Sequence, residues 1–479
     1  MQKLQQRTEK VTLNDNAMSR LCDFVQQRKN MPVKNNSFEQ FEKQLHQLVG
    51  ELEKELAAEE LSRYDIDMPV IEIEGVPYRR VNRCFKEYIG VAGKITVERS
   101  LYSDRRNDDR AICPLEKQAG IIEGNWTPTA AKQAAFAVAH MTPHECEKLF
   151  RILDNMKPSK SSLDRLPKKL NYKWEEKREE YDVVLCEKQS IPDEASTMAV
   201  SLDGVMVAMK DGKRKEKRAA AEEEGKRTRG PAGNSEASCG TVSYYDDSGE
   251  LLQTTRLGRM PESKKETLKE MLSLEIEKAL HQRPDLKIVK IADGAKDNWT
   301  FLSDTERLPD GIEVVDFYHA CDHLMEAFKS AYGERAPKTV AQFKKQRHIL
   351  RHDKDGVAKI IRAIAYIHKK YPRKKIIRRE LKYFRRNRKR MNYAVLAEKN
   401  IPIGSGVVEA ACKTLVTERM KRSGMRWRND GGQAILTLRS LIQSNRFDAG
   451  WNLLKENYTA KVAIPENVLE LRQAVTRNL

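Results

Sequence analysis

Two acidic residues in this 479-residue chain end apolar runs in the same way. Asp203 closes "TMAVSLDG" and Asp293 closes "IVKIADG". One Asp-Gly pair is usually a turn, but a carboxylate at the end of a buried strand is costly unless something stabilises it. Two such pairs, bracketing a hairpin and a helix, favour a functional site. We expect Asp203 and Asp293 at strand ends, where the following glycine frees the turn and exposes the carboxylate.

A third carboxylate, Glu409, lies in "GSGVVEAACK" at residues 404–413. Neighbouring aspartates repel each other unless a cation lies between them, and carboxylate oxygens suit Mg²⁺ or Mn²⁺. Three carboxylates are typical of a two-ion site for phosphodiester chemistry. The alternative for Glu409 is an acid placed in the first turn of a helix by the helix dipole. Asp297 and Glu418 compete with Asp293 and Glu409, but Asp297 follows the end of its strand and Glu418 is two and a half turns beyond Glu409.

The elements that carry these residues alternate between strand and helix. Residues 197–210, 286–294 and 311–320 are apolar strands, residues 237–258 form a hairpin, and a helix separates the hairpin from the second strand. This order predicts a central mixed sheet with flanking helices. From residue 321 onward the pattern is almost entirely helical.

Positive charge is concentrated in one part of the chain. The net charge is +18, and residues 341–390 hold 20 Lys and Arg against 3 Asp and Glu, an excess of 17. A solvated helix face usually mixes both signs, so this segment favours a polyanionic partner such as nucleic acid. Scattered cysteines, no signal peptide and no long apolar run predict a reduced, intracellular protein that does not enter a membrane.

The N-terminal part has three kinds of pattern. Residues 38–56 repeat apolar positions at helical spacing, and residues 68–103 alternate as short strands do. Beyond Thr127-Pro128, short helices joined by tight turns are typical of a helix-turn-helix module, although any three-helix bundle shares the pattern.

Four ordered blocks give this chain a specific resemblance. They are "SLDGV" (201–205), "ADGAKDNW" (292–299), "VVDFYHACDHL" (314–324) and "GSGVVEAACK…ERMKRSGMRW" (404–427). In this order they resemble the DDE transposases, and in particular the Mutator-like branch of bacterial insertion-sequence transposases, Kra-type lineage. The resemblance implies an α/β, RNase H-like mixed sheet with an all-α insertion. We expect N-terminal α+β and helix-turn-helix-like modules before it.

The resemblance implies that Asp203, Asp293 and Glu409 form a catalytic triad that binds two Mg²⁺ or Mn²⁺ ions. Asp316 and His319 match the family's acidic-or-Cys, two-residue, His motif and are expected to support the site or position DNA. Trp427 either stacks on a base or packs against the catalytic helix. The basic residues expected to contact DNA are Arg419, Lys421, Arg426, Arg385, Arg386, Arg388 and Lys389.

These expectations divide the chain into six parts. They are an N-terminal helical segment (1–66), a small β-containing module (67–125), a helix-turn-helix-like module with its linker (126–195), a catalytic domain (196–320 with 402–445), a basic helical insertion (321–401) and a C-terminal helical tail (446–479).

The expected function is metal-dependent cleavage and strand transfer at the ends of an insertion sequence. The partners are double-stranded DNA, as terminal inverted repeats and target, and further copies of the chain in a homodimer or larger oligomer. The expected location is the cytoplasm of a bacterium, at the nucleoid. The alternatives are an RNase H-like nuclease without strand transfer, a domesticated sequence-specific DNA-binding regulator, and a basic RNA-associated protein.

Overall fold

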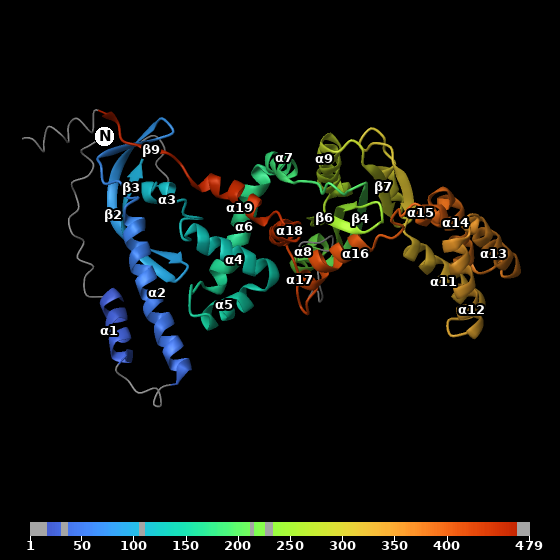
Figure 1. Cartoon of the computed structure of the whole chain (residues 1–479), viewed down its shortest axis with the longest axis horizontal. Helices are drawn as coiled ribbons and strands as arrows, with labels where there is room; N and C mark the ends of the chain where they lie inside the picture. The colour runs from blue at the N-terminus through green and yellow to red at the C-terminus, as the bar shows by residue number, and fades with distance from the viewer. Residues whose placement is uncertain (1–16, 30–36, 105–110, 211–214, 226–232, 467–479) are drawn as a thin grey trace, which may run out of the picture. The chain divides into compact units, whose positions relative to one another are not determined.

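The structure is a computed structural model that describes residues 17–29, 37–104, 111–210, 215–225 and 233–466 (Figure 1). It contains two compact units. Unit 1 combines Met1–Lys173 with Trp451–Leu479, and unit 2 is Trp174–Gly450. The ends of the expected segments 1–66 and 446–479 lie partly outside the described residues. No helix in the described ranges is both long and apolar enough to cross a membrane.

Unit 1 contains a four-stranded antiparallel sheet in the order β3-β2-β1-β9. The strands expected within residues 68–103 are present, and a short strand from the far end of the chain joins them. The hydroxyl of Tyr102 is buried in the core of this sheet and donates to the carbonyl oxygen of Met68 at 2.7 Å. The bounds are β1 Val70–Ile73, β2 Val76–Gly90, β3 Gly93–Ser103 and β9 Val462–Ala463.

The helices of unit 1 begin where the sequence predicts. Thr127-Pro128 starts α4, and Thr142 starts α5 with a capping box in which its hydroxyl accepts from the Glu145 N–H. The Thr142 capping box satisfies amide groups that the first helical turn of α5 would otherwise leave without partners. A DNA-binding role for these helices stays a prediction. The bounds are α1 Ala17–Lys29, α2 Phe38–Ser62, α3 Pro114–Gln118, α4 Pro128–His140, α5 Pro143–Ile152 and α6 Lys160–Glu176.

Unit 2 is built on a five-stranded mixed sheet in the order β6-β5-β4-β7-β8. β5 pairs antiparallel with both β6 and β4, whereas β7 pairs parallel with β4 on its other side, and β8 pairs parallel with β7. The prediction of an α/β fold with a mixed sheet is confirmed. The bounds are β4 Thr197–Ala208, β5 Asn234–Tyr245, β6 Leu251–Arg259, β7 Lys287–Ala292 and β8 Ile312–Val315.

Helices cover both faces of this sheet. On one face α9 packs so closely that a Cβ at Gly240 would lie 3.0 Å from Leu272 of that helix. On the other face Leu415 and Leu436 approach Gly258. Leu415 belongs to a π-helical segment that connects α16 to α17 without a break, and Leu436 belongs to α18. The bounds are α9 Glu266–Gln282, α16 Gly406–Ala411, the π-helix Cys412–Thr417, α17 Glu418–Met420 and α18 Asn429–Gln443.

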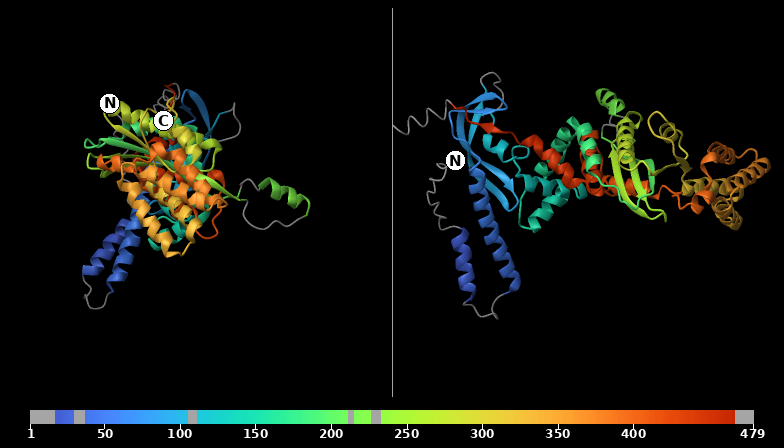
Figure 2. Two further views of the ribbon diagram at one scale, coloured as in Figure 1. Left: turned by 90° about the vertical axis from the view of Figure 1, so that its right-hand side faces the viewer. Right: turned by 45° about the horizontal axis from the view of Figure 1, so that its top comes forward.

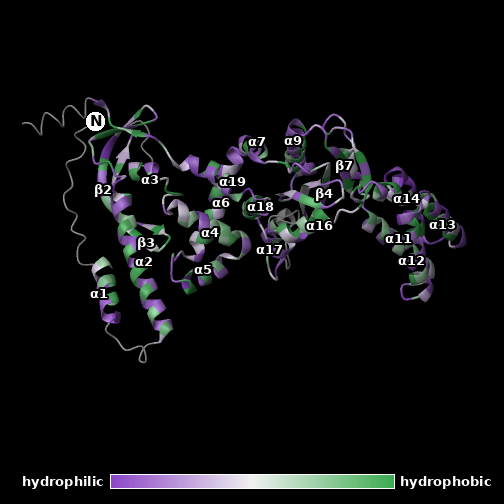
Figure 3. Cartoon of the chain, in the orientation of Figure 1, coloured by the Kyte–Doolittle hydropathy of each residue, from purple (hydrophilic) through white to green (hydrophobic). Residues whose placement is uncertain are grey.

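The insertion between β8 and α16 is helical, as predicted. Its helices gather beside one another in Figures 1 and 2, and Figure 3 shows hydrophobic and hydrophilic residues alternating along α13 and α14. Ile360, Ile364 and Ile367 form the buried stripe of α13, which leaves the basic residues on the outside. The bounds are α11 Phe317–Tyr332, α12 Pro337–His352, α13 Gly356–Lys370, α14 Lys375–Asn387, a 3₁₀ turn at Arg388–Arg390 and α15 Tyr393–Glu398.

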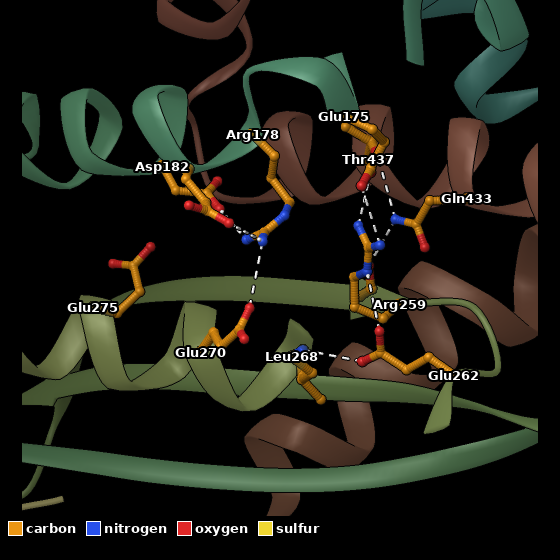
Figure 4. Close-up of polar contacts among 12 residues, drawn as sticks. Glu175, Arg178, Asp182, Arg259, Glu262, Leu268, Glu270, Glu275, Gln433 and Thr437 are labelled. Atoms are coloured by element: carbon orange, nitrogen blue, oxygen red, sulfur yellow. Dashed lines mark hydrogen bonds and ion pairs between the residues drawn. The ribbon is translucent and has the colours of Figure 1, made fainter. Parts of the chain in front are cut away.

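A polar layer fastens α7 (Arg178–Lys188) to α9 (Figure 4). The Arg178 guanidinium donates to Asp182 at 3.2 Å and reaches Glu270 of α9 at 3.4 Å. Deeper in the same layer, Arg446 forms a buried pair with Glu275 of α9. Burial raises the pKa of Asp182 to about 7, against the opposing effect of Arg178 and with a further increase from the charge of Glu275.

Asp182 therefore makes the stability of unit 2 depend on pH. Its folded-state pKa is raised, so the folded chain binds the proton more tightly than the unfolded chain between about pH 4 and 7. The stabilisation is fully present below about pH 4 and is lost as pH rises through about 7. In urea unfolding from pH 4 to 8, wild type should lose up to about 4 kcal/mol relative to Asp182→Asn, since one pKa unit is about 1.4 kcal/mol.

The matched control for this experiment is Glu180→Gln on the same helix, because Glu180 is exposed. It should follow wild type at every pH. An Asp182→Asn variant that also follows wild type from pH 4 to 8 would contradict the assignment.

Candidate functional site

Asp203 does not end its strand, which corrects the sequence-based expectation. β4 continues for five residues beyond it, to Ala208, and Asp203 pairs in register with Cys239 of β5. The glycine that follows lies within the strand rather than in a turn, and the space beside it is occupied by the Glu236 side chain, whose Oε1 would lie 1.8 Å from a Cβ at Gly204. The Asp203 carboxylate thus projects from the middle of a strand, with one oxygen accepting from the Gly204 N–H at 2.7 Å.

Asp293 lies where the sequence predicts, directly after β7. Its Oδ1 accepts from the Ala295 N–H at 3.1 Å and from the Asn298 side-chain amide at 3.0 Å, while its carbonyl oxygen accepts from Trp299 Nε1 at 2.6 Å. These bonds hold the turn between β7 and α10 (Lys296–Leu302) in one shape. The competing Asp297 lies on the first turn of α10, with an exposed side chain.

Parallel pairing of β4 with β7 brings the two aspartates together. Ser201 is opposite Ile291, so Asp203 and Asp293, each two residues further on, project from the same face at the same end of the sheet. Burial raises the pKa of the Asp203 carboxyl, and the negative charge of Asp293 raises it further. The predicted juxtaposition of these two carboxylates is therefore present in the structure.

Asp316 connects three parts of unit 2. It follows β8, is fully buried, and caps α11 by accepting from the His319 N–H at 2.6 Å. Its other oxygen accepts from the N–H of Ser405, at the start of α16. A buried carboxylate is tolerated when amide donors satisfy it. Asp316 thus links the end of the sheet to the segment that leads into Glu409, as a residue that supports the site.

Glu409 lies on the first turn of α16, as predicted, and its side chain is 48% exposed. Its Oε1 accepts from the Ser405 hydroxyl at 3.3 Å and lies 3.8 Å from His319 Nε2. Since the positive charge of a protonated His319 also lowers the pKa of Asp203, the imidazole lies within electrostatic reach of both carboxylates. His319 is therefore central to the site, whereas the sequence suggested only a supporting position.

The carboxylate oxygens at this site are the kind of ligand that a hard cation such as Mg²⁺ prefers, but they do not surround a metal position. Within the described part of the chain, no group of three or more His, Cys, Asp or Glu side chains is arranged to hold a metal ion. Asp203 and Asp293 provide adjacent carboxylate oxygens whose mutual repulsion a divalent cation would relieve. Glu409 faces His319 and remains the candidate third ligand.

Comparison with known proteins adds little to this geometry. No protein-family model matches the chain, and no curated protein matches it. Among solved structures, the chain is similar to the Drosophila P element transposase strand transfer complex, with 12% sequence identity over 70% of this chain and 82% of that chain, and a TM-score of 0.25. A superposition at this TM-score does not establish a shared fold, so nothing about function is taken from it.

Beyond Glu409, two of the residues expected to contact DNA, Arg419 and Trp427, pack against other residues of the protein instead. Arg419 is 2% exposed, and its guanidinium lies over the Trp427 ring at 5.4 Å, which corrects its expected role as a DNA contact. The π-helix before it contains more residues per turn than an α-helix, and so changes which face Arg419 occupies. Trp427 is half-buried and donates from Nε1 to the Met420 carbonyl at 2.9 Å, which favours packing over base stacking.

The other basic residues of the predicted DNA surface are exposed. Lys421 and Arg426 follow α17, and Arg385, Arg388 and Lys389 lie at the end of α14 and in the turn after it. Arg386 is also exposed, but it donates to the carbonyl oxygen of Gly294, next to Asp293. Contact with DNA stays a prediction for all of them.

Cys412 and Asn298 contact the aspartates but were not singled out from the sequence. The Cys412 thiol lies 3.7 Å from Asp203 Oδ2, and Asn298 donates to Asp293. Asn298 follows Asp293 within the same conspicuous block, so a local signal existed. Nothing local marks Cys412, because the sheet and the helix bring it to Asp203 across 209 residues.

Removing the Asp316 carboxylate should loosen the entry to α16. Asp316→Ala leaves the N–H groups of His319 and Ser405 without their acceptor, which should lower the free energy of unfolding by about 2 to 4 kcal/mol. Asp316→Asn keeps one acceptor oxygen and should lose about half as much. Asp322→Ala, at an exposed position on the same helix, is the control for thermal and urea unfolding. Equal stability of Asp316→Ala and Asp322→Ala would contradict the role of Asp316.

Proposed function

We propose that this chain is a DDE transposase of the Mutator-like, Kra-type branch, which cuts DNA at the ends of an insertion sequence and joins those ends to a target. The observation that carries the proposal is the Asp203–Asp293 pair on adjacent parallel strands. His319 lies 3.8 Å from Glu409, which follows the helical insertion, and acts electrostatically on Asp203.

The topology of unit 2 supports an RNase H-like assignment. Three antiparallel strands are followed by two strands parallel to the first, in the spatial order β6-β5-β4-β7-β8. The first strand of the unit carries Asp203, the fourth leads into Asp293, and Glu409 follows the insertion, as the resemblance of the four sequence blocks implies.

The proposed chemistry consists of two successive displacements at phosphorus. In the first, water attacks a phosphodiester at the element's end, the bond to the 3′ oxygen breaks, and that oxygen leaves as a 3′-hydroxyl. In the second, this hydroxyl attacks a phosphodiester of target DNA and displaces the target's own 3′ oxygen. Neither step forms a covalent bond to the protein, so catalysis rests on positioning and on stabilising charge.

Each group at the site has a place in this proposal. Asp203 and Asp293, with Glu409 as third ligand, would hold two Mg²⁺ or Mn²⁺ ions, which supply the positive charge that such displacements need. His319 is well placed to contact DNA beside Glu409. Exposed Lys421, Arg426 and the basic residues of α14 would neutralise the DNA backbone.

The proposal also requires an assembly. Two element ends must be joined to one target, so at least two copies of the chain are expected to act together on double-stranded DNA. Alternatives with the same site make different products: a nuclease cuts without joining, and a regulator binds DNA without cutting it.

Glu409→Gln tests the triad most directly. On a duplex that carries the inverted repeat flanking the gene, with Mg²⁺, its cleavage rate should fall about 100-fold or more, the scale on which losing one charge-stabilising group acts. DNA binding should remain. Glu418→Gln is the matched control, because Glu418 is the exposed competing acid further along the same helical stretch.

The products decide among the alternatives. Unimpaired cleavage by Glu409→Gln would refute the triad. Cleavage by wild type without joining would identify a nuclease, and binding without either reaction would identify a regulator.

The exposed basic residues should set the salt dependence of DNA binding. A plot of log affinity against log salt has a slope that reflects the number of phosphates contacted. Arg385→Ala combined with Arg388→Ala should make that slope shallower by about 2, one unit for each lost contact. Lys287→Ala, which removes an exposed charge at the opposite end of β7, should leave it unchanged. An unaltered slope in the double variant would remove α14 from the DNA surface.

A further inference from the structure

Helix α14 of the insertion contacts the turn that carries Asp293. Gly294, the residue after Asp293, is buried against this helix, and a Cβ at that position would lie 2.1 Å from Tyr383 Cε2 and 3.0 Å from Asn387 Nδ2. Arg386, on the same helix, donates to the Gly294 carbonyl oxygen. Helix α14 therefore contacts Gly294 both by side-chain packing and by a hydrogen bond.

Tyr383 is itself held firmly. Its ring stacks on His323 of α11 with the centroids 3.6 Å apart, and His323 Nδ1 is hydrogen-bonded to the fully buried Glu380. His323 of α11 and Glu380 of α14 thus form a backing for the Tyr383 ring. A ring that cannot move fixes the backbone packed against it.

Two polar atoms in this contact have no partner in the described part of the chain. They are the Tyr383 hydroxyl and Asn387 Nδ2, both buried. Burial raises the pKa of Tyr383, and the negative charges of Asp293 and Asp316 raise it further, which shows that the phenol lies near both carboxylates. Leaving buried donors unsatisfied costs free energy, so their retention beside Asp293 calls for a purpose beyond stability.

We infer that α14 is a positioning element of the site: Tyr383 and Arg386 set the turn of Asp293, and so set the affinity of the Asp203–Asp293 pair for a divalent cation. This inference rests on the proposed function. It makes the insertion part of the catalytic site as well as a surface for DNA, because the exposed Arg385 lies on the same helix as the residues that contact Gly294, and the exposed Arg388 directly follows that helix.

The test is a double-mutant cycle on Mn²⁺ binding, measured on the full chain without DNA from the electron paramagnetic resonance of free Mn²⁺. Gly294→Ala should weaken Mn²⁺ binding about 10- to 100-fold, the range for groups that orient metal ligands. Tyr383→Leu makes room for the new methyl group. In that background the same Gly294→Ala change should have an effect at least about tenfold smaller, because the two sites are in contact.

A matched control separates positioning from general damage. Gly311→Ala is also crowded, with its Cβ 2.9 Å from the side chain and the backbone oxygen of Ile288 on β7, but it lies at the opposite end of that strand from Asp293. It should lower the melting temperature and leave Mn²⁺ affinity unchanged. If Gly294→Ala does not fold, Arg386→Gln replaces it, with a several-fold loss of Mn²⁺ affinity that Arg386→Lys partly restores.

The outcomes are distinguishable. Wild-type chain that takes up no Mn²⁺ refutes the proposed metal site, and the inference with it. If wild type binds Mn²⁺ and Gly294→Ala binds it equally well, the role of α14 is overturned and the proposed function stands. The same conclusion follows if Gly294→Ala weakens Mn²⁺ binding equally in the wild-type and Tyr383→Leu backgrounds. If Gly294→Ala weakens Mn²⁺ binding and the double variant with Tyr383→Leu recovers it, the positioning role of α14 is established.

Discussion

The buried carboxylate of Asp316 is the interaction on which the site in unit 2 depends. It joins the end of β8, the start of α11 and the segment that enters α16, and so closes a loop of nearly ninety residues back onto the sheet. Closing a long loop costs conformational entropy, although the cost grows slowly with length. A fully buried anion that accepts two amide groups resists opening strongly. The position of Glu409 relative to the two strand aspartates follows from this one contact.

The sheet provides the second constraint. Asp203 and Asp293 come from neighbouring parallel strands, and register alone places them on one face at one end. Burial raises the pKa of Asp203, and the negative charge of Asp293 raises it further. Proteins keep such repulsion where a cation or a developing charge makes use of it. The insertion adds the third constraint, through the contact of α14 with Gly294.

Local patterns predicted much of this arrangement. Apolar runs followed by Asp-Gly located β4 and β7, and the turn after Ala292 was predicted correctly. The end of β4 was not, because Gly204 makes room for the Glu236 side chain on a neighbouring strand, which no local pattern reveals. Arg419 was expected to be exposed, since a basic residue after a helix usually is. A π-helix and the Trp427 ring bury it, and both depend on contacts distant in sequence.

The pairing of β9 with β1 has a consequence for how the chain is made. Unit 2 is encoded entirely within unit 1, and the sheet of unit 1 is completed only when Val462 and Ala463 pair with Ile73 and Glu72. At about 5 to 20 residues per second, the ribosome needs roughly 20 to 80 s to travel from one strand to the other. During that interval unit 2 can fold while unit 1 still lacks its last strand. The unit synthesised first is therefore the unit completed last. A nascent chain stalled before residue 462 would carry a finished five-stranded sheet in unit 2 and an unfinished sheet in unit 1.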